Sequence, residues 1–348
     1  MKIDIIGWYN RGNIGDEAFA NVMPQIFAGH DVRLVTPNCD PKQPYPDAVV
    51  LGGGAVVSPY YLKMLPPNEC PRYAVGIDIS YESEIDLLAA HNFKGVWVRN
   101  QTDLPALQEK LKCPVHYIPD LAFAIKLPLI NKLPEGAAEY LSGNKTNKRV
   151  GVLISDYISP AIDRPISEFA ARHWSFITNL ANKLDWMVES GWDVFFIPCA
   201  TAGYGDDRRI NANVAAFMRH KEKTIQLHEA MDPATMIEFL SQMNLTVCLR
   251  FHGHILSVMA GTPFVSIEHT RKVDLFLKEN CLMNTKCAKF YGNHFDTGGF
   301  KSAVEKILGE KHGPRYKQIA KNNQWLLETA HFPLIRKLVL SENPTEPA

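Results

Sequence analysis

The stretch that decides the fold reads "LTVCLRFHGHILSVMAGTPFVSIE" and covers residues 245–268. Residues 245–250 form an apolar run that predicts a strand, and residues 252–260 form a helical pattern that stops at Gly261. A second apolar run at 263–268 predicts another strand. Two apolar strands joined by a short helix are typical of the βαβ unit of a parallel sheet.

The same alternation of strands and helices extends in both directions along the chain. The predicted strands cover residues 2–7, 31–36, 47–54, 72–77, 94–100, 114–120, 149–155, 192–199 and 224–228. The predicted helices cover residues 15–28, 83–91, 102–111, 166–190, 207–218, 233–242 and 314–340, with Asp232 as the N-cap of the helix at 233–242. We therefore expect an α/β fold with parallel sheets.

A stretch rich in Pro, Gly, Asn and Lys divides this alternation into two halves. Residues 127–148 read as a linker that carries a short helix. We predict a Rossmann-like domain over 1–130, a linker over 131–147, a second Rossmann-like domain over 148–312, and a C-terminal helix over 313–348 that packs back across an inter-domain cleft. Ligands of such sheets bind beyond the carboxyl ends of the strands, where the strand order reverses.

Composition excludes several classes of protein. The 37 Lys and Arg balance the 37 Asp and Glu, which argues against a nucleic-acid surface. The seven Cys are scattered, with no CxxC pair, so we expect a reducing compartment and no zinc cluster. No stretch reaches transmembrane length, and the N-terminus is not typical of a signal peptide. These features predict a cytoplasmic protein.

Two glycine-rich turns follow strands in the first half. The first, "GWYNRGNIGDEAFA" at 7–20, offers backbone N–H groups at a helix start, which suits an anion or a sugar hydroxyl. It is neither GxGxxG nor a Walker loop, and an ordinary loop with a capping Asp is the alternative. The second, "VVLGGGAVV" at 49–57, allows close ligand approach or simply tight strand–helix packing. The candidate residues here are Asn10, Asn13, Gly15, Asp16, Gly52, Gly53 and Gly54.

Two further strand ends carry polar residues. Arg99 in "VRNQTDL" is a candidate for facing the ligand, and Asp120 in "YIPDLAF" is either a ligand contact or a structural cap. The loop "TAGYGDDRR" at 201–209 contains two Asp before a helix, and capping with ion pairs is the favoured interpretation there.

The motif "LRFHGH" at 249–254 is the sharpest functional signal. In an extended "RFH", Arg250 and His252 point to the same face, with Phe251 opposite. An Arg fork matches carboxylate or phosphate geometry, and a neighbouring His can donate or accept a proton. The alternatives are a core His and a metal pair of His252 with His254, and the adjacent Arg disfavours a metal.

The segment "IEHTRK" at 267–272 places more charge at the next strand end. It contributes Glu268, His269, Arg271 and Lys272. Basic residues at a helix start oppose the helix dipole, which favours a functional reason over a solvated charge cluster.

Taken in order, the motifs "GNIGDEA", "VVLGGG", "VRNQTD", "YIPDLAF" and "RFHGHILSVMAGTPFVSIEHTRK" resemble the polysaccharide pyruvyl transferase family over nearly the whole chain. The resemblance implies a glycosyltransferase B-type architecture with the active site between two Rossmann-like domains. It also implies transfer of pyruvate from phosphoenolpyruvate to two hydroxyls of a sugar as a ketal, with phosphoenolpyruvate as donor substrate and no cofactor or metal.

On this interpretation His252, Arg250 and Asp16 are catalytic, and the other candidates bind substrate. Arg250 holds the donor, His252 moves a proton, and Asp16 orients or deprotonates an acceptor hydroxyl. The acceptor is a glycan or glycan precursor of exopolysaccharide or cell-surface polysaccharide biosynthesis, either lipid-linked or not, and the chain is compatible with a homo-oligomer. Two alternatives stay open, a nucleotide-sugar-dependent glycosyltransferase of the same fold and a non-catalytic sugar- or anion-binding protein.

Overall fold

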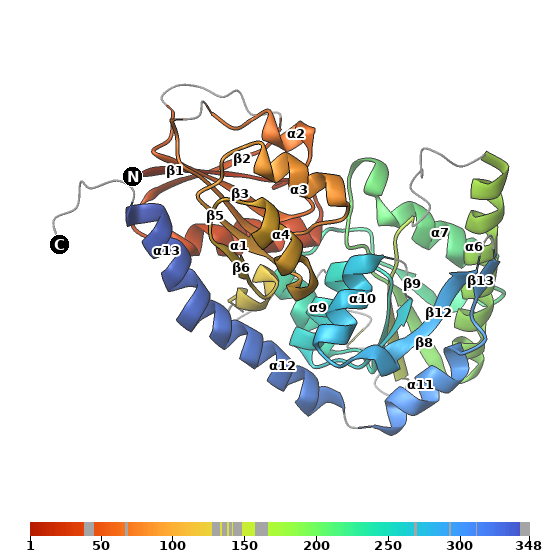
Figure 1. Ribbon diagram of the computed structural model, residues 1–348. Helices are drawn as coiled ribbons and strands as arrows, with labels where there is room; N and C mark the ends of the chain where they lie inside the picture. The colour runs from red at the N-terminus through yellow and green to blue at the C-terminus, as the bar shows by residue number, and fades with distance from the viewer. Residues whose placement is uncertain are drawn as a thin grey trace. The chain divides into compact units, whose positions relative to one another are not determined.

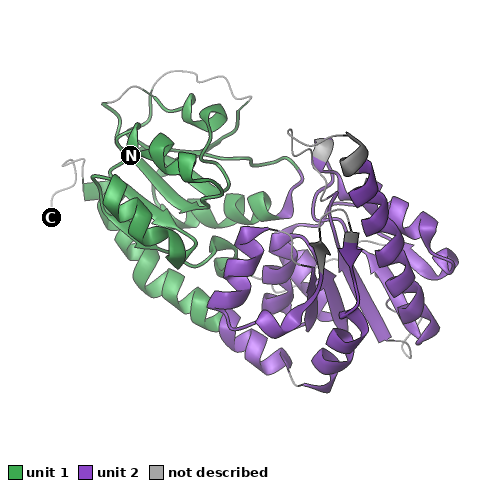
Figure 2. Cartoon of the chain, turned by 45° about the vertical axis from the view of Figure 1, so that its right-hand side comes forward, with its two compact units in different colours: residues 1–11, 15–126, 321–348 green, residues 12–14, 127–320 purple. Residues whose placement is uncertain are grey.

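The computed structural model describes residues 1–37, 45–66, 69–126, 133, 138, 141, 148–156, 166–267, 270–291, 294–310 and 312–341. The chain divides into two compact units (Figure 2). Unit 1 contains Met1–Arg11, Gly15–Lys126 and Lys321–Ala348, and unit 2 contains Gly12–Ile14 and Leu127–Ala320. The chain therefore enters unit 2 briefly at Gly12–Ile14, long before it enters for good after Lys126.

Unit 1 is built on a parallel sheet of six strands in the described residues, in the order β2-β1-β3-β4-β5-β6 (Figure 1). The strands are β1 (Lys2–Ile6), β2 (Asp31–Val35), β3 (Ala48–Gly54), β4 (Arg72–Ile77), β5 (Gly95–Val98) and β6 (Val115–Tyr117). The chain adds β2 on one side of β1 and β3 on the other, so the strand order reverses between β1 and β3. This reversal is the switch point of unit 1.

Helices bury the faces of this sheet. They are α1 (Ile14–Ile26), α2 (Pro59–Leu62), α3 (Glu82–Ala89) and α4 (Leu104–Lys110), with 3-10 turns η1 (Gln101–Asp103) and η2 (Leu121–Ala124). Successive side chains of β3 alternate between the faces, as strand geometry requires. Val49 and Leu51 belong to a core with residues of α2, α3 and α4, whereas a Cβ on Gly52 would meet Met23 of α1.

Unit 2 contains a sheet of seven strands in the described residues, in the order β13-β12-β11-β10-β7-β8-β9. The strands are β7 (Lys148–Leu153), β8 (Trp192–Phe196), β9 (Thr224–Gln226), β10 (Leu245–Cys248), β11 (Phe264–Ile267), β12 (Lys286–Tyr291) and β13 (His294–Asp296). The pairing is parallel except between β12 and β13. Because β8 lies on one side of β7 and β10 on the other, the switch point of unit 2 lies between β7 and β10.

The helices of unit 2 follow its strands in turn. They are α6 (Ile166–Glu189), α7 (Asp207–Phe217), α8 (Pro233–Ser241), α9 (Phe251–Ala260), α10 (Arg271–Glu279) and α11 (Phe300–Gly309), with 3-10 turns η3 (Gly203–Gly205), η4 (Lys221–Lys223) and η5 (Met283–Thr285). Apolar residues of α6, α7 and α11 share one buried core with β7, β8 and β10.

The C-terminal helical segment starts in unit 2 and ends in unit 1. It consists of α12 (His312–Leu326), a π-helical turn η6 (Leu327–His331) and α13 (Phe332–Ser341). Within unit 2, the rings of Tyr316 and Phe264 lie 5.3 Å apart. Within unit 1, Tyr73 Oη donates to the carbonyl of Leu338 at 3.0 Å.

Most predicted elements are confirmed, including two local details. Asp232 caps α8 by accepting from the N–H groups of Ala234 and Thr235, and Gly261 ends α9 with a left-handed φ of 74°. The C-terminal helix differs from its prediction because a π-helical turn interrupts it, and the sequence did not predict β12, β13 or α11. Most of the predicted linker, with its short helix, lies outside the described residues.

The predicted domain boundaries, and the packing of the C-terminal helix across a cleft, stay predictions.

Candidate functional site

The loop after β10 lies at the switch point of unit 2. The N–H groups of Leu249 and Arg250 donate to the carbonyl of Leu153 at 2.9 and 3.1 Å, which ties the end of β10 to the end of β7. Arg250 is the N-cap of α9, with φ −63° and ψ 131°, and Phe251 is already helical. The prediction that "RFH" is extended, with Arg250 and His252 on one face, is therefore wrong, because successive helical residues turn by about 100° rather than 180°.

The Arg250 guanidinium is held by a buried carboxylate, that of Asp207 at the start of α7. Arg250 Nε lies 3.0 Å from both Asp207 Oδ1 and Oδ2, Nη2 contacts Oδ1, and Nη2 also donates to the carbonyl of Gly205 at 2.7 Å. The Asp207 side chain is 0% exposed and that of Arg250 is 24% exposed. The ion pair therefore fixes one edge of the guanidinium at the point where the strand order reverses.

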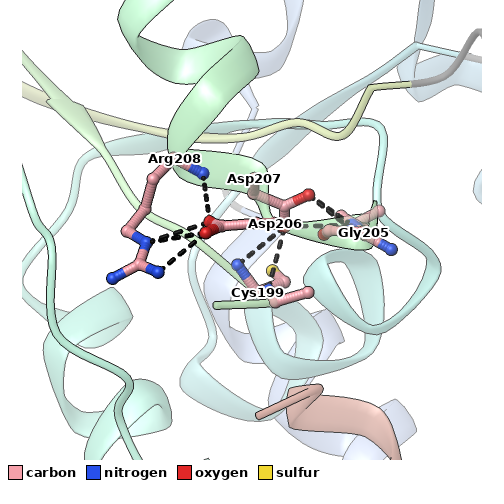
Figure 3. A network of polar contacts seen from close by, with 7 residues as sticks. Cys199, Gly205, Asp206, Asp207 and Arg208 are labelled. Atoms are coloured by element: carbon pink, nitrogen blue, oxygen red, sulfur yellow. Dashed lines mark hydrogen bonds and ion pairs between the residues drawn. The ribbon is translucent and has the colours of Figure 1, made fainter. Parts of the chain in front are cut away.

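Backbone donors complete the environment of Asp207. The N–H groups of Cys199 and Ala200 donate to Asp207 Oδ2 at 3.0 and 2.9 Å, as Figure 3 shows for Cys199. Burial raises the pKa of Asp207 to about 6, although Arg250 and the two N–H groups act in the opposite direction.

The neighbouring Asp206 has a different task. Its Oδ1 accepts from the Arg208 N–H at 3.0 Å, which caps α7, and its carboxylate pairs with the Arg208 guanidinium at 2.7 Å (Figure 3). The predicted combination of capping and ion pairs in this loop is thus confirmed. The role of Asp207 beside Arg250 was missed. A signal was present, because a helix needs only one Asp as its cap and the second of two consecutive Asp residues is then available for another role.

The turn at 199–201 also binds part of the N-terminal motif. The Ile14 N–H donates to the Cys199 carbonyl at 2.8 Å, the Thr201 N–H donates to the Gly12 carbonyl at 2.9 Å, and Asn13 forms an antiparallel bridge with Ala200. Gly12 has a φ of 68°, and a Cβ there would come within 2.8 Å of Thr201 Oγ1. Hence the structure brings Asn13 and Arg250 together around one turn of unit 2.

Lys272 is another basic residue of unit 2 that approaches the N-terminal part of α9. Its Nζ lies 5.6 Å from the centre of the Phe251 ring, and the His252 ring lies edge-on to the same ring at 5.2 Å. Arg271 is exposed, whereas Lys272 is half-buried. Lys272 and His252 therefore both border Phe251 near the N-terminus of α9, and Glu268 and His269 lie outside the described residues.

His254 has a structural environment rather than a ligand-facing one. It is 0% exposed, Nδ1 lies 2.8 Å from the Arg250 carbonyl oxygen, and Nε2 lies 2.8 Å from Ser266 Oγ. Burial lowers the pKa of His254 to about 4, so the ring is neutral at pH 7. This placement agrees with a core histidine and disagrees with the predicted substrate contact, because both ring nitrogens already bond to the protein.

In unit 1, two of the three consecutive glycines serve packing. Gly52 accepts from Tyr9 Oη at 2.5 Å, and a Cβ on Gly53, where φ is 77°, would lie 2.4 Å from Phe19. Gly54 is different, since a Cβ there would have ordinary contacts, with Asp16 Oδ1 at 3.7 Å. Of the three, Gly54 is thus the one that lies beside a candidate catalytic residue.

The turn between β1 and α1 is closed by Glu17. Asn10 has a positive φ of 56°, and the N–H groups of Asn10 and Arg11 donate to Glu17 at 3.2 and 2.8 Å. Gly15 is buried and Asp16 is half-buried in the first turn of α1. The structure therefore places Asn10, Gly15, Asp16 and Gly54 around the switch point of unit 1.

Arg99 and Asp120 form part of a buried charge network in unit 1. Arg99 Nη1 lies 2.5 Å from Asp120 Oδ2, and Arg99 Nη2 lies 3.4 Å from Asp78 Oδ2. Burial opposes the Arg99 charge, but Asp78 and Asp120 outweigh it and raise the pKa of Arg99. Asp120 also accepts from the Ala122 N–H at 2.9 Å, so the capping alternative for Asp120 is confirmed.

Comparison with known proteins defines the class of this chain. The family model for polysaccharide pyruvyl transferase matches residues 13–271. The chain therefore belongs to the polysaccharide pyruvyl transferase family. The matched segment includes Asn13 and Ile14 of the N-terminal turn and the Asp207–Arg250 pair, and it ends at Arg271, one residue before Lys272. The sequence matches none of the curated proteins.

Solved structures show the fold. Sucrose-phosphate synthase from Thermosynechococcus elongatus is similar with a TM-score of 0.61, at 11% identity, over 99% of this chain and 100% of that one. UDP-GlcNAc 2-epimerase from Methanocaldococcus jannaschii has a TM-score of 0.58, at 10% identity, over 93% and 100%. Arabidopsis thaliana UGT89C1 has a TM-score of 0.57, at 11% identity, over 98% of each chain.

These similarities confirm the predicted α/β class with two Rossmann-like sheets and the glycosyltransferase B-type fold. At such low identity they carry no further argument. In the described residues no helix is both long and apolar enough to cross a membrane. Nor does that part of the chain contain a group of three or more His, Cys, Asp or Glu able to hold a metal ion.

Proposed function

We propose that the protein transfers pyruvate from phosphoenolpyruvate to two hydroxyls of a sugar, forming a ketal and releasing phosphate. The observation that carries the proposal is Arg250, fixed by buried Asp207 at the switch point of unit 2. Phosphoenolpyruvate concentrates a phosphate and a carboxylate on three carbons. A guanidinium, an ammonium group and a helix N-terminus in one place suit such a ligand.

The donor is assigned to Arg250, Lys272 and the N-terminus of α9. Asp207 and the Gly205 carbonyl hold Nε and Nη2 of Arg250, so the proposal has this guanidinium meet the donor from a fixed position. The buried carboxylate holds this cation in position before the donor arrives, so little side-chain entropy is lost on binding. Lys272 reaches the same helix end over the Phe251 ring.

The chemistry follows from protonation of the donor. His252 donates a proton to the methylene carbon, which makes C2 electrophilic, and the first hydroxyl oxygen bonds to C2 as its proton leaves. The C2–O bond to phosphate then breaks, phosphate leaves with the bonding electrons, and the second hydroxyl oxygen bonds to C2 as its proton passes to the departing phosphate. Asp16 in unit 1 is assigned to orient a hydroxyl or accept its proton. Arg250 offsets the charge of the departing phosphate.

The proposal covers the setting of the reaction as well. The acceptor is a precursor of an exopolysaccharide or other cell-surface polysaccharide, free or lipid-linked, and the reaction takes place in the cytoplasm. It uses phosphoenolpyruvate as a substrate and no cofactor.

Thermal unfolding with candidate donors tests the proposal. A ligand that binds the native state raises the melting temperature by mass action. We expect stabilisation by phosphoenolpyruvate that is lost in Arg250→Ala and kept in Arg209→Ala, a matched change of an exposed Arg on α7. If only UDP-sugars raise the melting temperature, the protein is instead a glycosyltransferase that uses a nucleotide sugar. Phosphoenolpyruvate binding without ketal formation on any glycan of an acceptor panel would leave a binding protein.

A further inference from the structure

The switch point of unit 1 carries aromatic and charged side chains that the glycine turns and the donor site do not explain. β1 and β3 pair in register as far as Ile6 and Leu51, so the turns that follow them start at the same edge of the sheet. The first turn supplies Trp8 and Arg11, and α2, which follows the second, supplies Tyr61. Ligands of doubly wound sheets bind at this position.

Arg11 and Trp8 form a stacked pair. The Arg11 guanidinium carbon lies 5.1 Å from the centre of the Trp8 ring, and the backbone N–H of Arg11 donates to Glu17 Oε1 at 2.8 Å. Both residues are half-buried. A cation over an indole face restricts both groups and leaves the guanidinium N–H groups along its edge for hydrogen bonds.

Tyr61 lies within range of the charges on both Arg11 and Asp16. Burial raises the pKa of Tyr61 to about 12, with smaller upward contributions from Asp16 and Tyr60 and a downward one from Arg11. Tyr61 therefore keeps its proton at neutral pH and can both donate and accept a hydrogen bond. Its ring also lies edge-on to the Tyr60 ring at 5.2 Å, and Tyr60 is 42% exposed.

The charges in this region disfavour an anionic ligand. Asp16 lies beside Gly54 and Glu17 closes the turn at Arg11, so Arg11 shares this turn with two carboxylates. A phosphate would be repelled, whereas neutral hydroxyls could donate to the carboxylates and accept from Arg11. Partly exposed aromatic faces suit the C–H face of a pyranose ring, which is apolar.

We propose that Trp8, Arg11 and Tyr61, together with Asp16, form a subsite that binds a neutral hexopyranose unit of the acceptor. The subsite rests on the proposed function for its place in the reaction, but it binds sugar without the donor. The rings pack against the pyranose, and Arg11 and Tyr61 hold hydroxyls that Asp16 also reaches. Specificity for the sugar then comes from these four side chains.

Sugar binding in the absence of phosphoenolpyruvate tests the subsite. The probes are the methyl pyranosides of glucose, galactose and mannose, and saturation-transfer NMR measures their dissociation constants. We expect at least one to bind, and to bind at least about tenfold more weakly to Trp8→Ala and Tyr61→Ala, which is about 1.4 kcal/mol. Tyr61→Phe keeps the ring and should lose less.

Two controls separate the subsite from a general loss of folding and from the donor site. Tyr45→Ala removes an exposed Tyr of unit 1, and Arg250→Ala removes the donor residue of unit 2, and neither should alter sugar binding. Circular dichroism identifies any variant that fails to fold. If Tyr61→Ala does not fold, sugar binding is compared between the wild type and Tyr61→Phe. Unchanged binding in Trp8→Ala and folded Tyr61 variants would overturn the subsite, as would no binding of any pyranoside. If the protein binds the sugar but does not bind phosphoenolpyruvate, the result would refute pyruvyl transfer and still support the sugar subsite.

Discussion

Replacing Asp207 by Asn should impair the enzyme without removing any group that touches substrate. The Asp207 carboxylate contacts Arg250 through Nε and Nη2, and it accepts from Cys199 and Ala200. Asn keeps the size of the side chain and one acceptor oxygen, but it places an NH₂ group where an acceptor stood. Arg250 then loses its charged partner while remaining in the chain.

The magnitude follows from the bonds that are lost. A hydrogen bond to a charged group contributes ~1.5–3 kcal/mol, and breaking a buried ion pair by removing one partner costs ~3–5 kcal/mol. If the loss of these bonds raises the activation free energy by the same ~1.5–3 kcal/mol, kcat/KM for phosphoenolpyruvate falls roughly 10- to 150-fold. For a unit of this size, ~3–5 kcal/mol lowers the melting temperature by about 6–20 °C.

The assay is release of phosphate at varied phosphoenolpyruvate concentration, with Asp206→Asn as matched control. Asp206 is the adjacent residue and also forms a cap and an ion pair, but its partner is Arg208 rather than Arg250. We expect Asp206→Asn to lose stability and to keep its kcat/KM within about twofold. An equal loss of kcat/KM in both variants, or an unchanged value in Asp207→Asn, would refute the positioning role.

The pH dependence of Asp207→Asn adds a second readout. The pKa of Asp207 in the folded state is about 6, above its ordinary value of 3.8. Between these values the folded state holds a proton that the unfolded state has released, so this group makes the free energy of unfolding fall as pH rises from 3.8 to about 6. Urea unfolding across this window should show the slope in the wild type and not in Asp207→Asn.

Three further changes test the structural roles of other residues. Gly53→Ala should cost about 2–5 kcal/mol in urea unfolding, because φ is 77° and the new Cβ would lie 2.4 Å from Phe19. In the wild type, the free energy of unfolding should rise between about pH 4 and 6.5, because the pKa of His254 is about 4 in the folded state and 6.5 ordinarily, so only the unfolded state binds the proton in this range. His254→Gln should abolish this rise in urea unfolding. An unchanged pH profile would contradict the buried neutral ring. Asp232→Ala should lower the free energy of unfolding by about 1 kcal/mol through loss of the α8 cap, with kcat/KM unchanged, and Asp232→Asn should restore most of it.

Features set by local sequence could be predicted. The Asp232 cap and the Gly261 stop each depend on residues within a few positions, so the pattern of side chains contains the information. The alternation of strands and helices is similarly local, and it was enough to identify two sheets built mainly of parallel strands. The π-helical turn at Leu327–His331 was missed although it has a local signal, since Pro333, which has no backbone N–H to donate, follows it by two residues.

The candidate site could be predicted less completely, because its geometry depends on pairing at long range. The helix after β10 begins at Phe251, one residue earlier than predicted, and this single shift changes which face His252 occupies. Arg250 meets Asp207 across 43 residues of sequence, so no local pattern reveals the pair. His254 appears in the same motif as Arg250, yet burial makes it a structural residue.

The bonds between residues 12–14 and the turn at 199–201 have a consequence for recombination between relatives. A chimera that joins the N-terminal half of one family member to the C-terminal half of another at the linker would keep both sheets intact. It would still supply Gly12–Ile14 from one parent and the turn that carries Cys199 and Thr201 from the other. An active chimera should therefore need the "RGNIG" segment, residues 11–15, from the same parent as the C-terminal half. The two segments that must come from one parent are thus separated in the gene.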